Sequence, residues 1–309
     1  MEAREYSATL RVPTEHLWEY VAVVRPSVEQ ALLYHLPVGP DPSHELLNNA
    51  LRDAVFPGGK RWRPILTLLA AELVGGERCK VLSAAVAIEF LHTSSLIIDD
   101  LPCMDNAVER RHRPALHLSY GEALAVLAAL TLMNASYGLI MEGTSNGTLA
   151  RVVHREFVNS LGVCGLIGGQ LLDLGANGVI ESCNRSGPVR GLKTSPLIRL
   201  ALKSGAIISS GSDKQVSVLA RFGDLLGEAY QIGDDVIDTN EDRIHFRNAG
   251  LKRNLPMETT DPEVAQLIRT AKDLLVEEFG NMDAAIVLCE LAEHVLQRER
   301  QNLNAQPRN

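Results

Sequence analysis

Apolar residues recur at every third or fourth position along most of this 309-residue chain. That spacing places apolar side chains on one face of an α-helix, and it therefore predicts amphipathic helices. Segments of strictly alternating apolar and polar residues, which would predict strands, are scarce. The sequence thus predicts an all-α fold. The predicted helices cover residues 15–35, 44–55, 61–74, 80–99, 119–142, 152–174, 193–210, 214–238, 262–279 and 283–300.

Three polar segments that contain proline or glycine are predicted to be loops. They cover residues 37–42, 180–191 and 239–261. The Asn-Gly pairs at 146–147 and 177–178 are typical of turns between helices. We find no internal repeat and no low-complexity tract that would divide the chain. We therefore expect a single all-α domain that spans residues 1–309.

Composition limits the partners and the location of the chain. A hydrophobic content of 46% is enough for a full core, and a net charge of −8 disfavours a nucleic-acid partner. The five cysteines form no CxxC pair, which favours a reducing, cytoplasmic compartment. The longest apolar run, Ala123 to Met133, is shorter than the about 20 residues that a transmembrane helix needs. The sequence therefore predicts no membrane span.

Two aspartate clusters lie inside apolar helical stretches. The first is Asp99-Asp100-Leu-Pro-Cys-Met-Asp105, and the second is Asp234-Asp235-Val-Ile-Asp238. Carboxylates packed this closely repel one another and resist burial unless cations neutralise them. Oxygen ligands without a nearby histidine or cysteine set favour Mg²⁺ over zinc or iron. Two such clusters facing one cavity would hold several Mg²⁺ ions, and these ions would hold a diphosphate.

The spacing of the aspartates differs between the two clusters. Asp234 and Asp238 lie four residues apart and share a helix face, so they can share a metal site. Asp99 and Asp105 lie six residues apart, which a straight helix would place on different faces. Pro102 has no N–H to continue that helix, and a local bulge there would bring Asp105 back toward Asp99. For either cluster alone, a solvated helix end or an N-cap is the simpler interpretation.

Basic and polar residues that suit a diphosphate lie near these clusters or at helix starts. Lys60 and Arg63 enter an apolar helix after a Gly-Gly pair, and a helix N-terminus with two cations suits a phosphate. Arg110 and Arg111 follow the first aspartate cluster; the alternative for this pair is a surface patch that neutralises nearby acids. The further candidates are His92, Lys193, Thr194 and Gln231.

Six motifs, taken in order, resemble those of the trans-isoprenyl diphosphate synthases, close to the short-chain geranylgeranyl and farnesyl diphosphate synthases. They are GGKRWRP (58–64), IEFLHTSSLIIDDLPCMD (88–105), RRHRPALHLSYGE (110–122), GLIGGQLLDL (165–174), LKTSPLI (192–198) and GEAYQIGDDVID (227–238). The resemblance implies a type I isoprenoid-synthase helical bundle around a central cavity. It implies a prenyltransferase that condenses isopentenyl diphosphate with an allylic diphosphate, with geranylgeranyl diphosphate as the expected product. It also implies three Mg²⁺ ions and a homodimer, with helix 119–142 at the subunit contact.

The resemblance assigns roles residue by residue. The residues expected to bind Mg²⁺ are Asp99, Asp100, Asp105, Asp234, Asp235 and Asp238. Those expected to bind isopentenyl diphosphate are Lys60, Arg63, His92 and Arg111, and those expected to grip the allylic diphosphate are Arg110, Lys193, Thr194 and Gln231. Gln170 and Asp173 match a GGQxxDL motif near the allylic pocket. The residues expected to act in catalysis are Asp99, Asp100, Asp105, Lys193, Asp234 and Asp235.

The floor of the cavity sets the expected product length. The growing prenyl chain is expected to run along the helix that carries Asp99, past Ser95 and Ser94, which lie four and five residues before it. An aromatic side chain there would close the cavity early, whereas two serines leave it open. We therefore predict a product at least as long as geranylgeranyl diphosphate. Candidates for a deeper floor are Leu130, Met133 and Phe157.

Departures from the family pattern keep two other functions open. They lie at Ile98, Ala107 and Ala129-Leu130, and in the altered loop 239–256, where Arg247 and Lys252 or Arg253 replace expected lysines. A catalytically weak subunit that modulates another synthase is one alternative, and six intact aspartates argue against it. The other is a terpene cyclase on the same scaffold. A cyclase has no use for residues that bind isopentenyl diphosphate.

Overall fold

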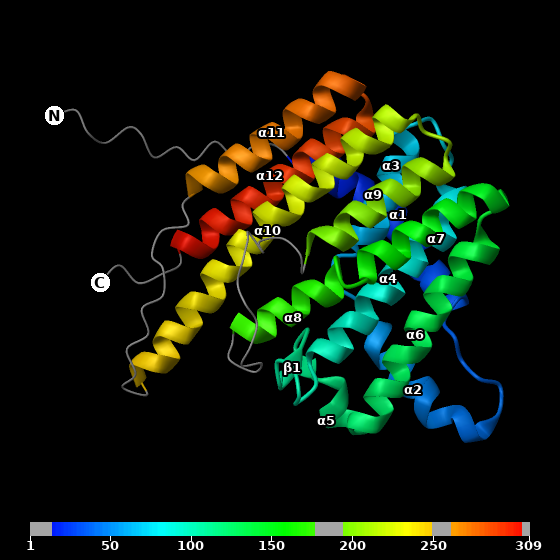
Figure 1. Cartoon of the computed structure of the whole chain (residues 1–309), viewed down its shortest axis with the longest axis vertical. Helices are drawn as coiled ribbons and strands as arrows, with labels where there is room; N and C mark the ends of the chain where they lie inside the picture. The colour runs from blue at the N-terminus through cyan, green and yellow to red at the C-terminus, as the bar shows by residue number, and fades with distance from the viewer. Residues whose placement is uncertain (1–13, 177–193, 249–260, 305–309) are drawn as a thin grey trace.

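The computed structural model describes residues 14–176, 194–248 and 261–304, with the backbone alone for 175–176, 233–248, 261 and 298–304. These residues form helices and one small hairpin (Figure 1), which confirms the all-α prediction. The helices are α1 (Glu15–Tyr34), η1 (Pro42–His44), α2 (Glu45–Val55), α3 (Trp62–Leu73), α4 (Arg78–Asp99), α5 (Leu116–Tyr120), α6 (Glu122–Gly143), α7 (Gly147–Leu161), α8 (Leu166–Ala176), α9 (Ser195–Ile208), α10 (Asp213–Asn248), α11 (Asp261–Phe279) and α12 (Asp283–Asn304). The hairpin strands are β1 (Glu109–Arg110) and β2 (Arg113–Pro114).

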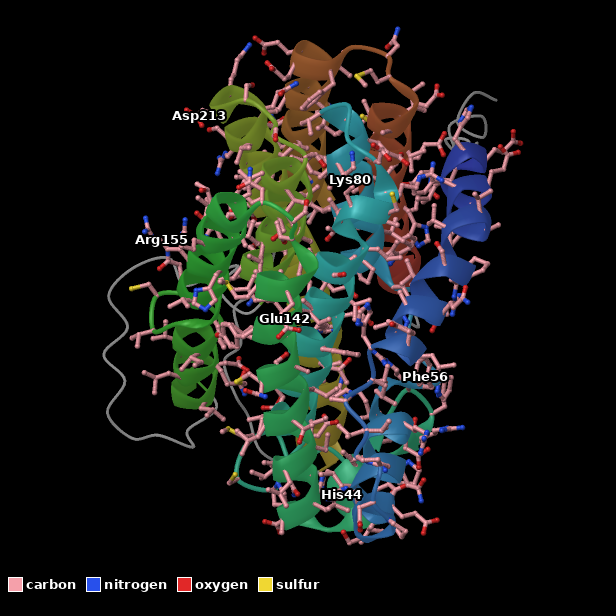
Figure 2. All side chains as sticks on the ribbon, turned by 90° about the vertical axis from the view of Figure 1, so that its right-hand side faces the viewer. His44, Phe56, Lys80, Glu142, Arg155 and Asp213 are labelled. Atoms are coloured by element: carbon pink, nitrogen blue, oxygen red, sulfur yellow. The ribbon has the colours of Figure 1, made fainter. Side chains whose placement is uncertain are left out.

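Helix α4 lies in the interior of the bundle. Its buried residues, from Val81 to Ile97, point in every direction around the helix axis, as expected for a helix that others surround. Helices α6, α3 and α9 pack against it, and Figure 2 shows α4 and α6 side by side along the length of the molecule. Nearly all the buried apolar side chains of the described residues form one cluster; Ala115, Ala150 and Leu174 lie outside it. The assignment of residues 1–309 to a single domain stays a prediction.

Glycines explain two places where helices break differently from the prediction. The predicted helix 119–142 is interrupted by Gly121, whose φ of 83° separates α5 from α6. The predicted helix 152–174 is two helices, α7 and α8. Between them Gly165 packs so tightly that a Cβ would lie 2.2 Å from the Ser160 carbonyl oxygen. The predicted turn at 146–147 is present, and Asn146 caps α7 through the N–H of Thr148 at 2.9 Å.

Helix α10 is longer than the sequence predicted. We predicted a helix end at residue 238 and a loop over 239–261, but the helix continues to Asn248. The polar run over 239–248 contains neither glycine nor proline, and an exposed helix can be polar all round, so polarity alone was a poor guide. The predicted turn at 177–178 and the predicted loop 180–191 lie outside the described residues.

Three helical segments are long and apolar enough to cross a membrane by length and composition alone. They are Arg78–Asp99, Glu122–Gly143 and Gly147–Leu174. The prediction that no stretch is long enough is therefore not confirmed. The apolar window of Arg78–Asp99 is 67% buried, which packing within the bundle explains, whereas that of Glu122–Gly143 is only 33% buried. Helix α6 therefore presents an apolar face to its surroundings.

Candidate active site

The first aspartate cluster lies where α4 ends. Asp99 is the last residue of α4 and Asp100 is its C-cap, because Pro102 cannot continue a helix. The chain then turns back: the N–H of Asp105 donates to the carbonyl oxygen of Asp99 at 2.9 Å, and Asn106 has a left-handed φ of 51°. The predicted return of Asp105 toward Asp99 is therefore present. A helix end followed by a tight turn produces it, instead of a bulge within a helix.

Asp100 and Arg110 form an ion pair beside this turn. Asp100 is 3% exposed, and each of its carboxylate oxygens accepts a hydrogen bond from Arg110 Nε at 3.1 Å, with Arg110 Nη2 as a further donor. The hydrogen bonds to Asp100 raise the pKa of Arg110. Arg110 thus neutralises a buried acid in this structure, as in the alternative interpretation of the arginine pair. The metal-binding role of Asp100 and the substrate-binding role of Arg110 stay predictions.

His92 on α4 and Arg63 in the first turn of α3 lie in contact, with 3.0 Å between His92 Nε2 and Arg63 Nη1. Burial lowers the pKa of His92 well below its usual value, and the positive charges of Arg63 and Arg111 lower it further. The imidazole is therefore neutral. Because a guanidinium can only donate, Nε2 must be the accepting nitrogen. The structure thus gathers three residues of the predicted isopentenyl diphosphate site, and the cluster has an excess of positive charge.

The hairpin that carries Arg111 is a tight turn built from unfavourable residues. Arg110 pairs with Arg113, and between them Arg111 and His112 have φ values of 55° and 62°. A turn with positive φ at both central positions is the type I′ turn, which favours asparagine and glycine. The turn holds Arg111 beside Gly59, where a Cβ would lie 3.5 Å from Arg111 Nε. Strained backbone conformations of this kind are common at functional sites, which supports the predicted substrate-binding role of Arg111.

We expect His112→Gly to raise the free energy of unfolding by about 0.5–1 kcal/mol. Glycine adopts the φ of 62° without the Cβ clash, and the fully exposed His112 side chain makes only a distant contact, 3.5 Å, with Glu109. Denaturant unfolding measures the change. His112→Ala is the control, because it loses the same contact but keeps the Cβ. An equal gain in both variants would show that backbone strain is not the cause.

Lys60 lies in an aromatic cluster that the sequence did not predict. Its Nζ is 3.2 Å from His294 Nε2 and 5.9 Å from the centroid of the Trp62 ring. The Trp18 ring completes the cluster, 5.7 Å from the Trp62 ring and 5.2 Å from the His294 ring between centroids. Helices α1 and α12 thus contact the predicted substrate-binding loop. No sequence spacing relates Trp18, Trp62 and His294, so only the tertiary structure reveals this cluster.

Two glutamines predicted near the allylic diphosphate have unsatisfied amides. Both amide atoms of Gln170 on α8, and Oε1 of Gln231 on α10, are buried without a hydrogen-bond partner among the described residues. Leaving such an atom unpaired costs about 1–3 kcal/mol, so a polar partner, either water or a ligand, is expected beside each of them. Thr194 is the N-cap of α9. Gly227, one turn before Gln231, lets α10 approach the start of α9, where a Cβ would lie 2.4 Å from Ser195 Oγ.

Several predicted site residues lie outside the described side chains. Asp234, Asp235 and Asp238 belong to α10, where the backbone alone is described, and Lys193 lies outside the described residues. Asp173 lies half-buried on α8, three residues after Gln170. No three acidic, histidine or cysteine groups converge among the side chains that are described. A metal site would therefore need ligands from beyond these side chains, which the second cluster was predicted to supply.

The residues predicted to limit product length differ in burial. Ser94 is fully buried, and its Oγ finds no partner within the described part of the chain. Ser95 is partly exposed and donates to the His92 carbonyl oxygen at 2.9 Å. Phe157 is fully buried, and Met133 packs against the core. Leu130 is 53% exposed on the outer face of α6, so the prediction that it forms part of an inner floor is wrong.

The bundle matches solved structures of prenyl diphosphate synthases. It aligns with an FPP/GFPP synthase from Zymomonas mobilis at a TM-score of 0.78 and 27% identity, over 92% of this chain and 100% of that one. A geranyltransferase from Legionella pneumophila gives a TM-score of 0.77 at 26% identity, over 93% and 99% of the two chains. The fold and the gathered residues together define a prenyltransferase.

Sequence comparison places this prenyltransferase in a family. The family model described as polyprenyl synthetase matches residues 44–249, and the chain belongs to the polyprenyl synthetase family. The chain is 33% identical over 297 residues to the chloroplastic geranylgeranyl pyrophosphate synthase of Capsicum annuum, across 92% of this chain and 78% of that protein. The predicted family and the predicted trans-prenyltransferase class are confirmed.

Proposed function

We propose that the protein condenses isopentenyl diphosphate with an allylic diphosphate and releases a short-chain prenyl diphosphate, with geranylgeranyl diphosphate as the main product. The supporting observation is the gathering of Arg63, neutral His92 and Arg111 close to the turn that joins Asp99 to Asp105. A cationic cluster beside an acidic turn suits two diphosphates, one bound by arginines and one bound through metal ions. The name of the Capsicum annuum relative supports the proposed product.

The chemistry of the aspartate cluster fits magnesium. Asp99 and Asp105 offer hard carboxylate oxygens, and His92, two turns earlier on α4, is hydrogen-bonded to Arg63. We propose that the carboxylates of the two aspartate motifs together hold three magnesium ions. Magnesium, when bound, stabilises the negative charge that grows on a leaving diphosphate.

The chain's own residues would bind and orient the second substrate. Arg63 and Arg111 offer guanidinium donors to the diphosphate of isopentenyl diphosphate, and Lys60 adds an ammonium group from the loop before α3. His92 stays neutral because of its burial and its cationic neighbours, so one ring nitrogen accepts from Arg63 and the other carries a proton to donate. The apolar walls of the surrounding helices would keep water from the allylic cation.

A direct test incubates the purified protein with Mg²⁺, isopentenyl diphosphate and each allylic diphosphate in turn, with analysis of the extracted products. We expect a longer prenyl diphosphate, mainly of geranylgeranyl length. A hydrocarbon formed from one allylic substrate alone would instead identify a cyclase. No product from the isolated chain, together with altered output from a synthase mixed with it, would identify a modulating subunit.

We expect Ser95→Phe to shorten the product. Ser95 lies one helical turn before Asp99 on the same face of α4, so an aromatic ring there would fill the path of the growing chain. Ser94→Phe should shorten the product too, but it adds volume at a fully buried position and should cost about 1–3 kcal/mol of stability. Product analysis measures both effects. An unchanged product in both variants would place the floor elsewhere.

We propose that two copies of the chain associate through α6. Leu127, Leu130 and Met141 are 51%, 53% and 45% exposed, and they lie on one face of that helix, on which Asn134 is the exposed polar residue between Leu130 and Met141. A largely apolar face of this kind marks an interaction surface. Leu130→Glu is therefore expected to convert a dimer to a monomer in sedimentation velocity experiments. Leu46→Glu is the control, because Leu46 is equally apolar and 61% exposed on α2; a dimer that survives Leu130→Glu would contradict the proposal.

We also propose a cytoplasmic, reducing location. Cys79, Cys103 and Cys164 carry free, exposed thiols in the structure. Exposed thiols persist in compartments where cellular reductants keep them reduced.

A further inference from the structure

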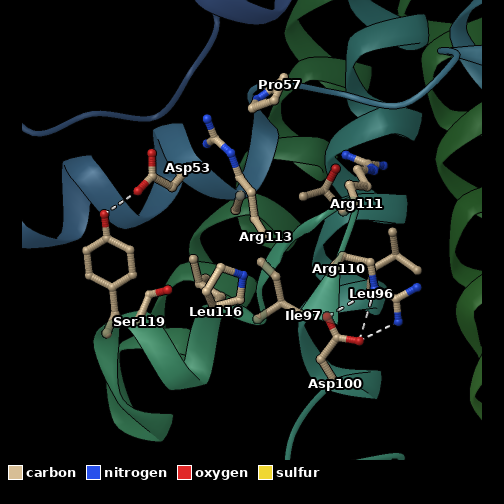
Figure 3. A pocket seen from close by; sticks show the side chains of 14 residues that line it. Asp53, Pro57, Leu96, Ile97, Asp100, Arg110, Arg111, Arg113, Leu116 and Ser119 are labelled. Carbon is tan, nitrogen blue, oxygen red and sulfur yellow. Dashed lines mark hydrogen bonds and ion pairs between the residues drawn. The ribbon is translucent and has the colours of Figure 1, made fainter. Parts of the chain in front are cut away.

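A pocket of about 300 Å³ lies between α2, the end of α4, the hairpin and α5. Figure 3 shows Arg111 and Arg113 from the hairpin above it, Asp53 from α2 at one side, and Asp100 with Arg110 at the other. Neither the sequence motifs nor the proposed reaction uses this pocket as a whole. Its lining is mostly charged and polar over an apolar base, which is typical of a site for a small charged ligand.

The pocket lies on a different face of α4 from the predicted substrate residues. Thr93, Ile97 and Asp100 line it, and they follow one another at helical spacing. His92 and Asp99 lie on the face toward which the active-site residues gather. Successive residues rotate by about 100° around a helix, so the two faces are about a third of a turn apart. The pocket therefore lies beside the predicted active site, on another face of α4, and shares Asp100, Arg110 and Arg111 with it.

Arg111 makes no hydrogen bond or ion pair among the described residues. Burial lowers its pKa, the positive charges of Arg61 and Arg110 act in the same direction, and the negative charges of Glu89 and Glu29 oppose them without reversing the shift. Within the described part of the chain, Arg113 makes one hydrogen bond, a long one of 3.4 Å to the Phe56 carbonyl oxygen. Donors of both guanidinium groups therefore remain available to an anion in the pocket.

A buried hydroxyl completes the set of donors. Thr93 is 2% exposed, lines the pocket, and its Oγ1 has no hydrogen-bond partner among the described residues. An unpaired buried hydroxyl is uncommon, because it loses its bonds to water without replacement. A ligand oxygen in the pocket would satisfy it. Together with Arg111 and Arg113, Thr93 offers donors from two different elements of the fold.

We propose that this pocket binds a phosphate monoester with a short apolar group, through Thr93, Arg111 and Arg113. The acidic residues of the pocket limit the charge of the ligand. Asp100 is neutralised by Arg110, and Asp53 accepts a 2.5 Å hydrogen bond from Tyr120, a bond that raises the Tyr120 pKa to about 12. With two aspartates against three arginines, the pocket suits a phosphate better than a more highly charged diphosphate.

The base of the pocket suits the organic part of the ligand. Leu96, Ile97 and Leu116 provide apolar contact below the arginines. Because Arg111 also belongs to the predicted isopentenyl diphosphate site, an anion in this pocket would hold Arg111 away from that substrate. The ligand would therefore raise the KM for isopentenyl diphosphate. This consequence alone rests on the proposed function; binding to the pocket does not.

Calorimetric titration tests the binding without metal or prenyl substrates. The probes are n-pentyl phosphate and inorganic phosphate, and the variants are Thr93→Val, Arg113→Gln and Lys60→Ala. We expect saturable binding of pentyl phosphate, severalfold tighter than that of inorganic phosphate. Thr93→Val should weaken it about fivefold and Arg113→Gln about tenfold, whereas Lys60→Ala should leave it unchanged. Thr93→Val removes a hydroxyl without a partner and keeps the shape, so its thermal unfolding should match that of the parent protein.

Two results would overturn the proposal. One is a loss of binding in Lys60→Ala with normal binding in Thr93→Val and Arg113→Gln, because the anion would then occupy the predicted isopentenyl diphosphate site. The other is the absence of saturable binding to the parent protein. Equal affinity for the two probes would overturn the assignment of an organic group to the apolar base. None of these results depends on whether the protein transfers prenyl groups, which the product assay tests separately.

Discussion

Asp99→Ala is expected to lower the turnover number by about 10³-fold, which corresponds to about 4 kcal/mol of activation free energy. Asp99 ends α4, and its carbonyl oxygen accepts a hydrogen bond from the N–H of Asp105. With Asp100, these two aspartates are the part of the proposed metal site whose side chains the structure describes. Without Asp99, the charge on the leaving diphosphate would lose much of its stabilisation. Steady-state kinetics with saturating substrates and Mg²⁺ measures the loss, and circular dichroism checks that the helices remain.

Two neighbouring carboxylates provide the comparison for this variant. Asp100→Asn should reduce turnover less than Asp99→Ala, because the carboxylate of Asp100 is occupied by Arg110 and is only 3% exposed. Glu109→Gln removes an exposed carboxylate from the same region and should leave turnover within about twofold. A turnover number of Asp99→Ala close to that of the parent protein would remove the first aspartate cluster from the mechanism.

Arg61→Ala is expected to lower the free energy of unfolding by about 3–5 kcal/mol. The Arg61 side chain is fully buried and pairs with Glu89 at 2.7 Å and Glu29 at 3.0 Å, and it donates to the Val55 carbonyl oxygen at 2.8 Å. Removal of the guanidinium leaves Glu89, whose side chain is 3% exposed, as an unpaired buried charge. Because Arg61 joins α1, α2 and α4 below the Gly58-Gly59-Lys60 loop, the loop should lose its support as well.

An exposed arginine gives a matched control for Arg61. Arg25 pairs with the same Glu29, at 3.5 Å, but its side chain is 46% exposed. Arg25→Ala should therefore cost no more than about 1 kcal/mol. Urea unfolding of both variants measures the difference. Similar losses of stability in the two variants would show that the buried ion pairs of Arg61 are not what holds this loop.

Gly58 makes room for the buried side chain of Arg61. A Cβ at Gly58 would lie 1.8 Å from Arg61 Cζ, so the buried guanidinium occupies the space that a side chain would need. Arg61 itself has a left-handed φ of 58°. Gly58 is therefore needed for the packing of Arg61 at least as much as for a turn before α3.

Helical periodicity was sufficient for most of the fold, because most helices of this bundle have one apolar and one polar face. The failures have physical causes. The end of α10 is mostly polar, and its two apolar residues, Ile244 and Phe246, lie two apart, so the segment has no apolar helical period to detect. The hairpin strands are two residues long and carry no alternation. Gly121 and Gly165 break helices within segments whose period continues across them.

In the candidate site too, features that depend on neighbouring residues were predicted, and contacts between residues far apart in the sequence were missed. The return of Asp105 toward Asp99 was predicted from Pro102, because a proline acts within a few residues. The roles of Arg61 and His294 were missed, because each depends on partners far away in the sequence. From the sequence, Arg61 cannot be distinguished from the other basic residues of its motif. Only its ion pairs with Glu29 and Glu89 show that it has a structural role.

The aromatic cluster beside Lys60 can serve as an intrinsic fluorescence probe of the predicted substrate-binding loop. The chain has two tryptophans in all, Trp18 and Trp62, and their rings lie together with the His294 ring next to the Lys60 ammonium group. Intrinsic fluorescence excited in the indole band therefore originates at a single spot of the molecule. Any change of charge or solvation at Lys60 would alter this emission directly, without a label and without a mutation.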